Sequence, residues 1–199
     1  IARMENGVPT IKKSETLKDT IPSCINFSRK QDILVGDTAY NVLKNDSARA
    51  LKTFEKGQKN TFIEFKRTMG TTHKEESPNM NRNFSSEELS AEVLKKLKSL
   101  VPDENISSIV ITVPAKFLNP QNEATMQAAK IVGFKHVELL QEPVAAATAY
   151  GLGSKSKDGY WLVFDFGGGT FDAALVKAEE GILSVKDTGI GIPEEDVSR

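Results

Sequence analysis

The chain contains one cysteine, Cys24, among 199 residues, so no disulfide can form within it. A disulfide-stabilised secreted scaffold is therefore excluded, and a reducing, cytoplasmic location is expected. The charges nearly cancel, with 26 Lys and Arg against 27 Asp and Glu, which argues against binding to nucleic acid or to a membrane surface through excess positive charge. No stretch approaches the roughly 18 apolar residues of a membrane span.

The length corresponds to one large domain or two small ones, with enough chain to bury a core. The first residues read as a strand without an initiator methionine, and the last residues have no helix or strand pattern of their own. We therefore expect a piece of a longer chain.

The first part of the chain predicts short antiparallel strands. Asn6-Gly7 is the strongest hairpin signal, and it lies at the centre of a strand pair in residues 1–11. Residues 23–28 and 32–35 predict a second pair.

Helical patterns follow. Asp37 is placed to start one helix, and Ser85 with Glu88 forms the capping-box pattern that starts another. The polar segment 70–83 between them predicts a loop.

From residue 106 strand and helix patterns alternate, which predicts an α/β layer with a largely parallel sheet. Strands are predicted at 109–113, 137–140 and 161–166, and helices at 119–132 and 143–150. Residues 153–159 are the best candidate for a linker.

The sequence VFDFGGGTFD at 163–172 carries the most information about function. Strand patterns lie on both sides of the glycines, so neither the Walker loop nor the dinucleotide-binding loop fits, because both lead into a helix. The segment predicts a hairpin whose backbone N–H groups can approach a phosphate closely, with Thr170 adding a hydroxyl.

Two acidic residues, Asp165 and Asp172, flank this turn. Carboxylates repel a phosphate unless a cation lies between them, and Mg²⁺ suits such a mixture of carboxylate, water and phosphate oxygens. From spacing alone, a tight glycine hairpin with solvated acids is an equally good interpretation.

Three segments, 109–117 (IVITVPAKF), 139–152 (LLQEPVAAATAYGL) and 163–172, together resemble the nucleotide-binding domain of seventy-kilodalton heat-shock chaperones of the DnaK type. The resemblance implies the actin-like ATPase (ribonuclease-H-like) fold, mainly its first lobe with the start of the second. Its subdomains would be a core sheet (residues 1–22 and 102–153), a reduced peripheral part (23–101) and the phosphate hairpin with the second lobe (154–199).

The resemblance also implies a site for ATP or ADP, with Mg²⁺ and a monovalent cation, K⁺. The residues concerned are Lys66, Glu142, Asp165 and Thr170 for catalysis, Gly167, Gly168, Gly169 and Thr170 for the phosphates, and Asp165, Asp172 and Glu142 for the metals. The parent protein would be an ATPase that couples nucleotide state to peptide binding, and the fragment alone would be inactive.

The implied partners are unfolded peptide, held by a domain outside this sequence, a J-domain co-chaperone and a nucleotide-exchange factor. The sequence departs from the family's pattern at Asn122, where the arginine partner of the switch proline, Pro114, is expected. The first phosphate loop and the adenosine-binding motif are not in the sequence.

Other interpretations stay open. A small-molecule (sugar) kinase of the same superfamily and a nucleotide-dead interaction module are the alternatives. Residues 187–196 resemble the glycine box of histidine-kinase-type ATP-binding domains, but the rest of that domain's pattern is missing, so a divergent loop or a cloning tail is the favoured interpretation of this segment. His73 and His136 are isolated, which favours structural or solvated roles over zinc binding. Cys24 is predicted to be a buried structural thiol.

Overall fold

A computed structural model describes residues 1–53, 57–102, 105–151, 158–167 and 170–187. The chain divides into unit 1 (Ile1–Ser108 and Glu123–His136) and unit 2 (Ile109–Asn122 and Val137–Arg199), and each is described by itself. None of the helices in these described ranges has the length and apolar character needed to cross a bilayer.

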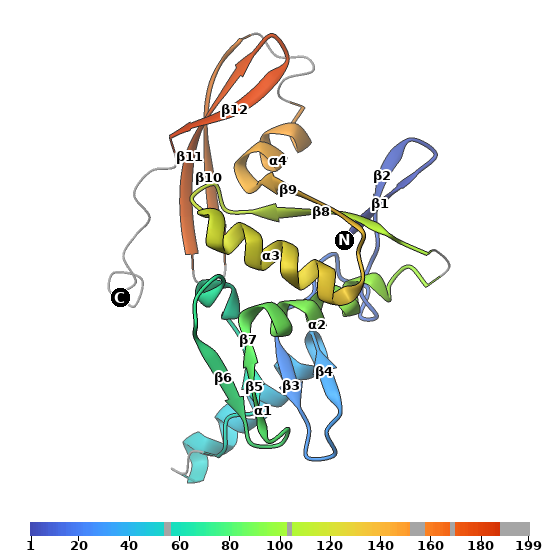
Figure 1. The fold of residues 1–199 in the computed structure, drawn as a ribbon, viewed down its shortest axis with the longest axis vertical. Helices are drawn as coiled ribbons and strands as arrows, with labels where there is room; N and C mark the ends of the chain where they lie inside the picture. The colour runs from blue at the N-terminus through green and yellow to red at the C-terminus, as the bar shows by residue number, and fades with distance from the viewer. Residues whose placement is uncertain (54–56, 103–104, 152–157, 168–169, 188–199) are drawn as a thin grey trace. The chain divides into compact units, whose positions relative to one another are not determined.

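Unit 1 combines short strands with two main helices (Figure 1). Its elements are β1 (Ala2–Glu5), β2 (Val8–Ile11), β3 (Ile25–Phe27), β4 (Ile33–Val35), α1 (Asp37–Thr53), β5 (Thr61–Phe62), the 3₁₀ turn η1 (Phe65–Thr68), β6 (Lys74–Ser77), β7 (Arg82–Ser85) and α2 (Ser86–Lys98). Helix α3 (Asn119–Val132) begins in unit 2 and continues in unit 1.

The two predicted strand pairs are confirmed. Strands β1 and β2 pair antiparallel, with Glu5 opposite Val8. The connecting Asn6 and Gly7 both have positive φ, 51° and 79°, as the tight hairpin turn requires. Strands β3 and β4 also pair antiparallel.

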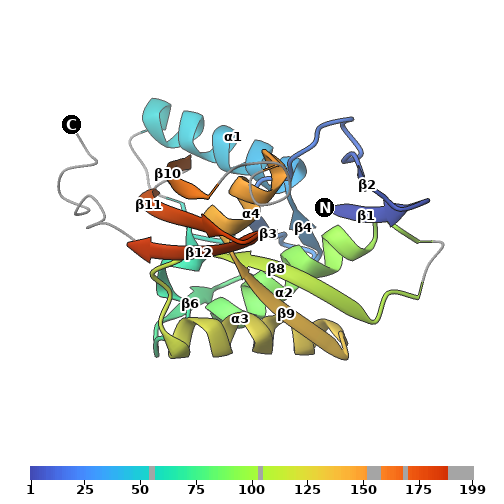
Figure 2. The ribbon, with the colours of Figure 1, turned by 90° about the horizontal axis from the view of Figure 1, so that it is seen from above.

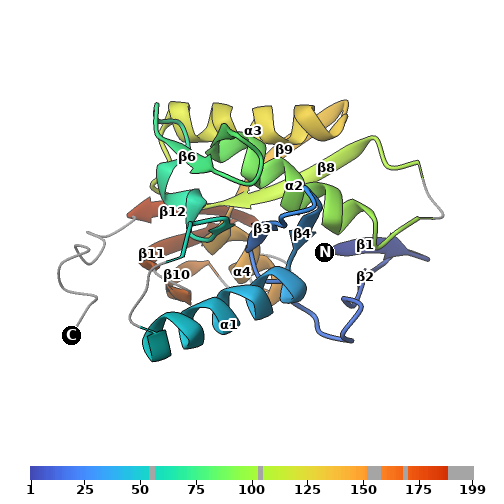
Figure 3. The same cartoon turned by 90° about the horizontal axis from the view of Figure 1, so that it is seen from below.

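An aromatic core holds unit 1 together. The sheet β4–β3–β5 lies between α1 and α2, which contact opposite sides of it (Figure 3). Phe27 stacks on Phe84 with ring centroids 4.3 Å apart and meets Phe62 at 5.8 Å. These rings pack with Leu89 of α2, so burial of apolar surface joins the sheet to the helix.

The predicted start of α2 is confirmed in detail. The Ser85 hydroxyl accepts a hydrogen bond from the Glu88 amide at 3.3 Å, and the Glu88 carboxylate accepts one from the Ser85 amide at 2.8 Å. This reciprocal pair satisfies two of the amides that a helix start leaves without partners.

The predicted loop at 70–83 is wrong, because β6 and β7 form an antiparallel hairpin there. A distant side chain fixes this hairpin: the Asn60 side-chain oxygen accepts hydrogen bonds from the Ser77 hydroxyl at 3.0 Å and from the Asn79 amide at 2.9 Å. Because Asn60 lies 17 to 19 residues before its partners, this contact cannot be recognised from a local hydrophobic pattern in the sequence.

Unit 2 contains two sheets. Strand β8 (Ser108–Val113) neighbours β9 (His136–Gln141), while β10 (Gly159–Gly167), β11 (Thr170–Glu179) and β12 (Ile182–Asp187) form a second sheet in that order (Figure 2). Helix α4 (Glu142–Ala149) packs against the second sheet. The predicted strands and helices are confirmed, but the expected single, largely parallel layer is wrong, because β10, β11 and β12 form a separate antiparallel meander.

We expect Gly36→Ala to destabilise the chain more than Gly7→Ala. Both glycines have nearly the same positive φ, 78° and 79°, so both substitutions carry the backbone penalty of about 1–2 kcal/mol. A Cβ on Gly36 would lie 2.6 Å from the Cγ2 atom of Ile21, whereas one on Gly7 meets nothing within 4 Å. The extra loss in the free energy of unfolding, about 1–3 kcal/mol, is measurable by urea unfolding. Equal losses for the two variants would show that the Ile21 side chain moves aside without an energetic penalty.

Candidate functional site

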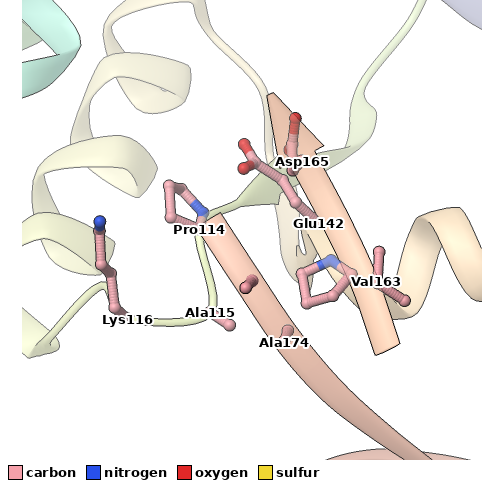
Figure 4. A pocket seen from close by; sticks show the side chains of 9 residues that line it. Pro114, Ala115, Lys116, Glu142, Val163, Asp165 and Ala174 are labelled. Atoms are coloured by element: carbon pink, nitrogen blue, oxygen red, sulfur yellow. The ribbon is translucent and has the colours of Figure 1, made fainter. Parts of the chain in front are cut away.

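A pocket in unit 2 contains Glu142 and Asp165, two of the three acidic residues selected from the sequence (Figure 4). Its empty space is about 280 Å³, open solvent included, which is less than a typical ligand pocket. It is too small to enclose a whole nucleotide. Its lining consists of Pro114, Ala115, Lys116, Glu142, Pro143, Val163, Asp165, Ala173 and Ala174.

Glu142 reaches this pocket from the junction of β9 and α4. It is the first residue of α4, and it follows Gln141, whose φ of −65° and ψ of 132° are extended. Pro143 lies in the first helical turn, where its fixed φ suits the helix and its missing N–H costs nothing. An acid at this position also interacts favourably with the helix dipole. Glu142 therefore has a structural role at the start of α4 in addition to its place in the pocket lining.

Asp165 lies on β10 and shares the alternating pattern of that strand with Val163, which also lines the pocket. The antiparallel register places Asp165 directly opposite Asp172 and Gly167 directly opposite Thr170. The predicted hairpin is therefore confirmed, with both acids two residues inside their strands. Gly168 and Gly169 lie outside the described residues, and with them the predicted cradle of backbone amides.

The pocket combines mostly apolar walls with three charged side chains. Six of the nine lining residues are apolar, and the charged ones are Lys116, Glu142 and Asp165. The Glu142 and Asp165 carboxylates carry the same charge and repel one another, and low-dielectric walls strengthen the field of nearby charges. A divalent cation with its own water shell would offset the repulsion, and the oxygens here are the ligand type that Mg²⁺ prefers. Within the described residues, no group of three or more His, Cys, Asp or Glu side chains is gathered as a metal site.

The remaining predicted residues are distributed over both units. Lys66 is exposed on η1 of unit 1. His73 lies 3.4 Å from a carboxylate oxygen of Glu75. The Asn122 side-chain oxygen is buried, and no hydrogen-bond partner for it is found in the described part of the chain.

Lys116 lines the pocket, and the sequence interpretation did not select it. A signal was present, because Lys116 follows the end of β8 by three residues and Glu142 directly follows β9. Since β8 and β9 are neighbours in one sheet, charged residues just after both strands can meet at one place.

The chain is an α/β protein with two carboxylates in one small pocket next to the β10–β11 hairpin, and carboxylate oxygens are the ligand type that Mg²⁺ prefers. The family is then plain from comparison: the model of the family described as "Hsp70 protein" matches residues 1–192, so the chain belongs to the Hsp70 family. This match includes most of the segment with the glycine-box resemblance, whose residues 188–196 lie outside the described ranges, as does most of the linker candidate 153–159.

Curated relatives agree with this membership. The chain is 35% identical to a "Chaperone protein dnaK" from Phaeodactylum tricornutum, and 36% identical to each "Chaperone protein DnaK" from Prochlorococcus marinus and Mycoplasmopsis agalactiae. Each alignment covers 94% of this chain but only 33%, 32% and 29% of the respective relative. The chain thus spans about a third of the length of these relatives.

Cys24 is buried, as predicted, with 1% of its surface exposed. Burial raises the pKa of its thiol to about 11, because the charged thiolate loses its solvation. We expect a thiol-specific reagent at pH 8.5 to label the folded chain at least about a hundredfold more slowly than the urea-unfolded chain. The contribution of Cys24 to the free energy of unfolding should fall as the pH rises from about 9 to 11, since in this range its thiol ionises in the unfolded chain but not in the folded one. Rapid labelling of the folded protein would contradict the burial of this thiol.

Proposed function

We propose that this chain is part of the ATP-binding and ATP-hydrolysing domain of a molecular chaperone. The observation that carries the proposal is the meeting of Glu142 and Asp165 in one pocket, on a hairpin that closes through Gly167 and Thr170. Membership of the Hsp70 family supports it. A sugar kinase is less well supported, since the pocket of the described residues offers mostly apolar side chains and no set of polar groups for a sugar.

In this proposal the chain has the actin-like fold, with the subdomains at 1–22 and 102–153, 23–101 and 154–199. The pocket is too small for a whole nucleotide, so it would receive the phosphates while other parts of the parent protein bind the adenosine. Gly167, Gly168, Gly169 and Thr170 would contribute backbone N–H groups and a hydroxyl to the phosphates.

Asp165 and Glu142 would hold the water ligands of Mg²⁺, which supplies charge neutralisation when bound. Asp165 would also accept a hydrogen bond from the attacking water and orient its oxygen towards the terminal phosphorus. The water oxygen forms a bond to that phosphorus as the bond between phosphorus and the bridging oxygen breaks, so ADP leaves and the water's protons are released with inorganic phosphate or to solvent. Positioning and electrostatic stabilisation do the catalysis, and no covalent intermediate with the protein is needed.

Three further assignments complete the proposal. Asp172 would help to coordinate a monovalent cation such as K⁺, and Lys66 would contact the terminal phosphate. Hydrolysis would control the affinity of a separate domain for unfolded peptide, and a J-domain co-chaperone and a nucleotide-exchange factor would be the partners. Action in the cytoplasm stays a prediction.

The variant Asp165→Asn, made in the full-length protein, tests the proposal. The amide has the shape of the carboxylate but no charge, so we expect ATP turnover to fall by about a hundredfold or more. The thermal midpoint of the unliganded variant should stay nearly unchanged, because Asp165 is exposed and the amide keeps the shape of the carboxylate. Turnover by phosphate release and unfolding by calorimetry are the measurements.

Asp46→Asn is the matched control, since Asp46 is an exposed acid on α1 that pairs with Arg49. It should leave both quantities unchanged. Full turnover by Asp165→Asn would remove this carboxylate from the mechanism, and a wild-type protein that binds no nucleotide would overturn the proposed function itself.

A further inference from the structure

Lys116 brings the only cationic side chain among the residues that line the pocket. Figure 4 shows the charged ends of Lys116, Glu142 and Asp165 extending towards the same side, the direction in which β10 runs from Val163 to Asp165. That direction leads to the end of the hairpin at Gly167.

The backbone of Lys116 is held in a tight turn. The Phe117 amide donates a hydrogen bond to the Pro114 carbonyl at 3.1 Å, so Lys116 occupies the third position of a four-residue turn between β8 and α3. Pro114 at the first position restricts this turn further. The turn thus fixes the backbone position from which the exposed Lys116 side chain extends.

Lys116 brings a positive charge to a pocket that also contains two carboxylates. Metal-bound triphosphate still carries net negative charge, and the two carboxylates repel the oxygens that the metal does not cover. An ammonium that extends from the lining of a pocket with mostly apolar walls attracts those oxygens, and the low dielectric strengthens the attraction.

We propose that Lys116 is a further binding residue of this site, whose ammonium contacts the terminal phosphate of the nucleotide. The inference rests on the proposed function and adds to it a specificity element that favours triphosphate over diphosphate. Because the side chain is flexible and stays near the surface, it contributes to binding the ground state and the transition state alike. It should therefore affect affinity more than the rate of the chemical step.

The test is calorimetric titration of the full-length protein with Mg²⁺ and either a non-hydrolysable ATP analogue or ADP. We expect Lys116→Gln to weaken binding of the analogue by about three- to tenfold and to leave binding of ADP nearly unchanged. Lys116→Arg should restore the analogue's affinity, because the charge returns. Raising the ionic strength from about 0.05 to about 0.5 M should reduce the difference between wild type and Lys116→Gln, since salt screens an exposed charge.

Lys130→Gln is the control, because Lys130 is an exposed lysine of α3 that does not line the pocket. In steady-state hydrolysis Lys116→Gln should raise KM with kcat within about twofold. Equal affinity of the wild type and Lys116→Gln for the analogue would overturn the inference. Tighter binding by the variant would also overturn it, since Lys116 would then be a counter-ion that opposes the metal. In both cases binding of nucleotide by the wild type leaves the proposed function standing.

Discussion

The register between β10 and β11 is the constraint on which the site depends. It sets Asp165 opposite Asp172 and closes the hairpin between Gly167 and Thr170. Side chains alternate between the two faces of a strand, so a shift of one residue would move Asp165 away from the pocket and bring Phe164 into its place. The packing of α4 against this sheet and the position of the carboxylates therefore depend on the same register. A change that loosens the register would disrupt both the site and the packing of unit 2.

The pocket brings together two acids, Glu142 of α4 and Asp165 of β10. Like charges that lie close together repel, so this arrangement is more favourable with a positive partner. A cation that binds the folded chain stabilises it by mass action. In the proposed function, the stability of unit 2 and the occupancy of its pocket would be coupled in this way.

Much of the fold could be predicted because its signals are local. Asn6-Gly7 determines its turn through backbone conformations that these two residues adopt easily, and Ser85 with Glu88 starts a helix through hydrogen bonds within four residues. The part of the site on β10 was predictable for the same reason, since strand pattern, acid and glycines are contiguous. Glu142 needed the family resemblance, because an acid before a proline at a helix start also has a purely structural explanation.

The rest depends on contacts between distant parts of the chain. The β6–β7 hairpin is fixed by Asn60, outside the hairpin, and no periodicity reports such a contact. The strands of unit 2 form two sheets. An alternating pattern of helices and strands does not indicate which strands pair with one another, so this division could not be predicted from it. Lys116 belongs to the pocket only because β8 and β9 are neighbours, and a single lysine after a strand is otherwise unremarkable.

Strand β10 has one more property. Among the described strands it lies at the edge of its sheet, and its nine residues include neither lysine nor proline, the residues that commonly protect such edges. Tyr160 and Leu162 on its outward face are 62% and 58% exposed. Where such an edge is left uncovered, hydrogen-bonding groups and apolar side chains together form a template for pairing with another chain, and here they lie on the strand that also carries Asp165.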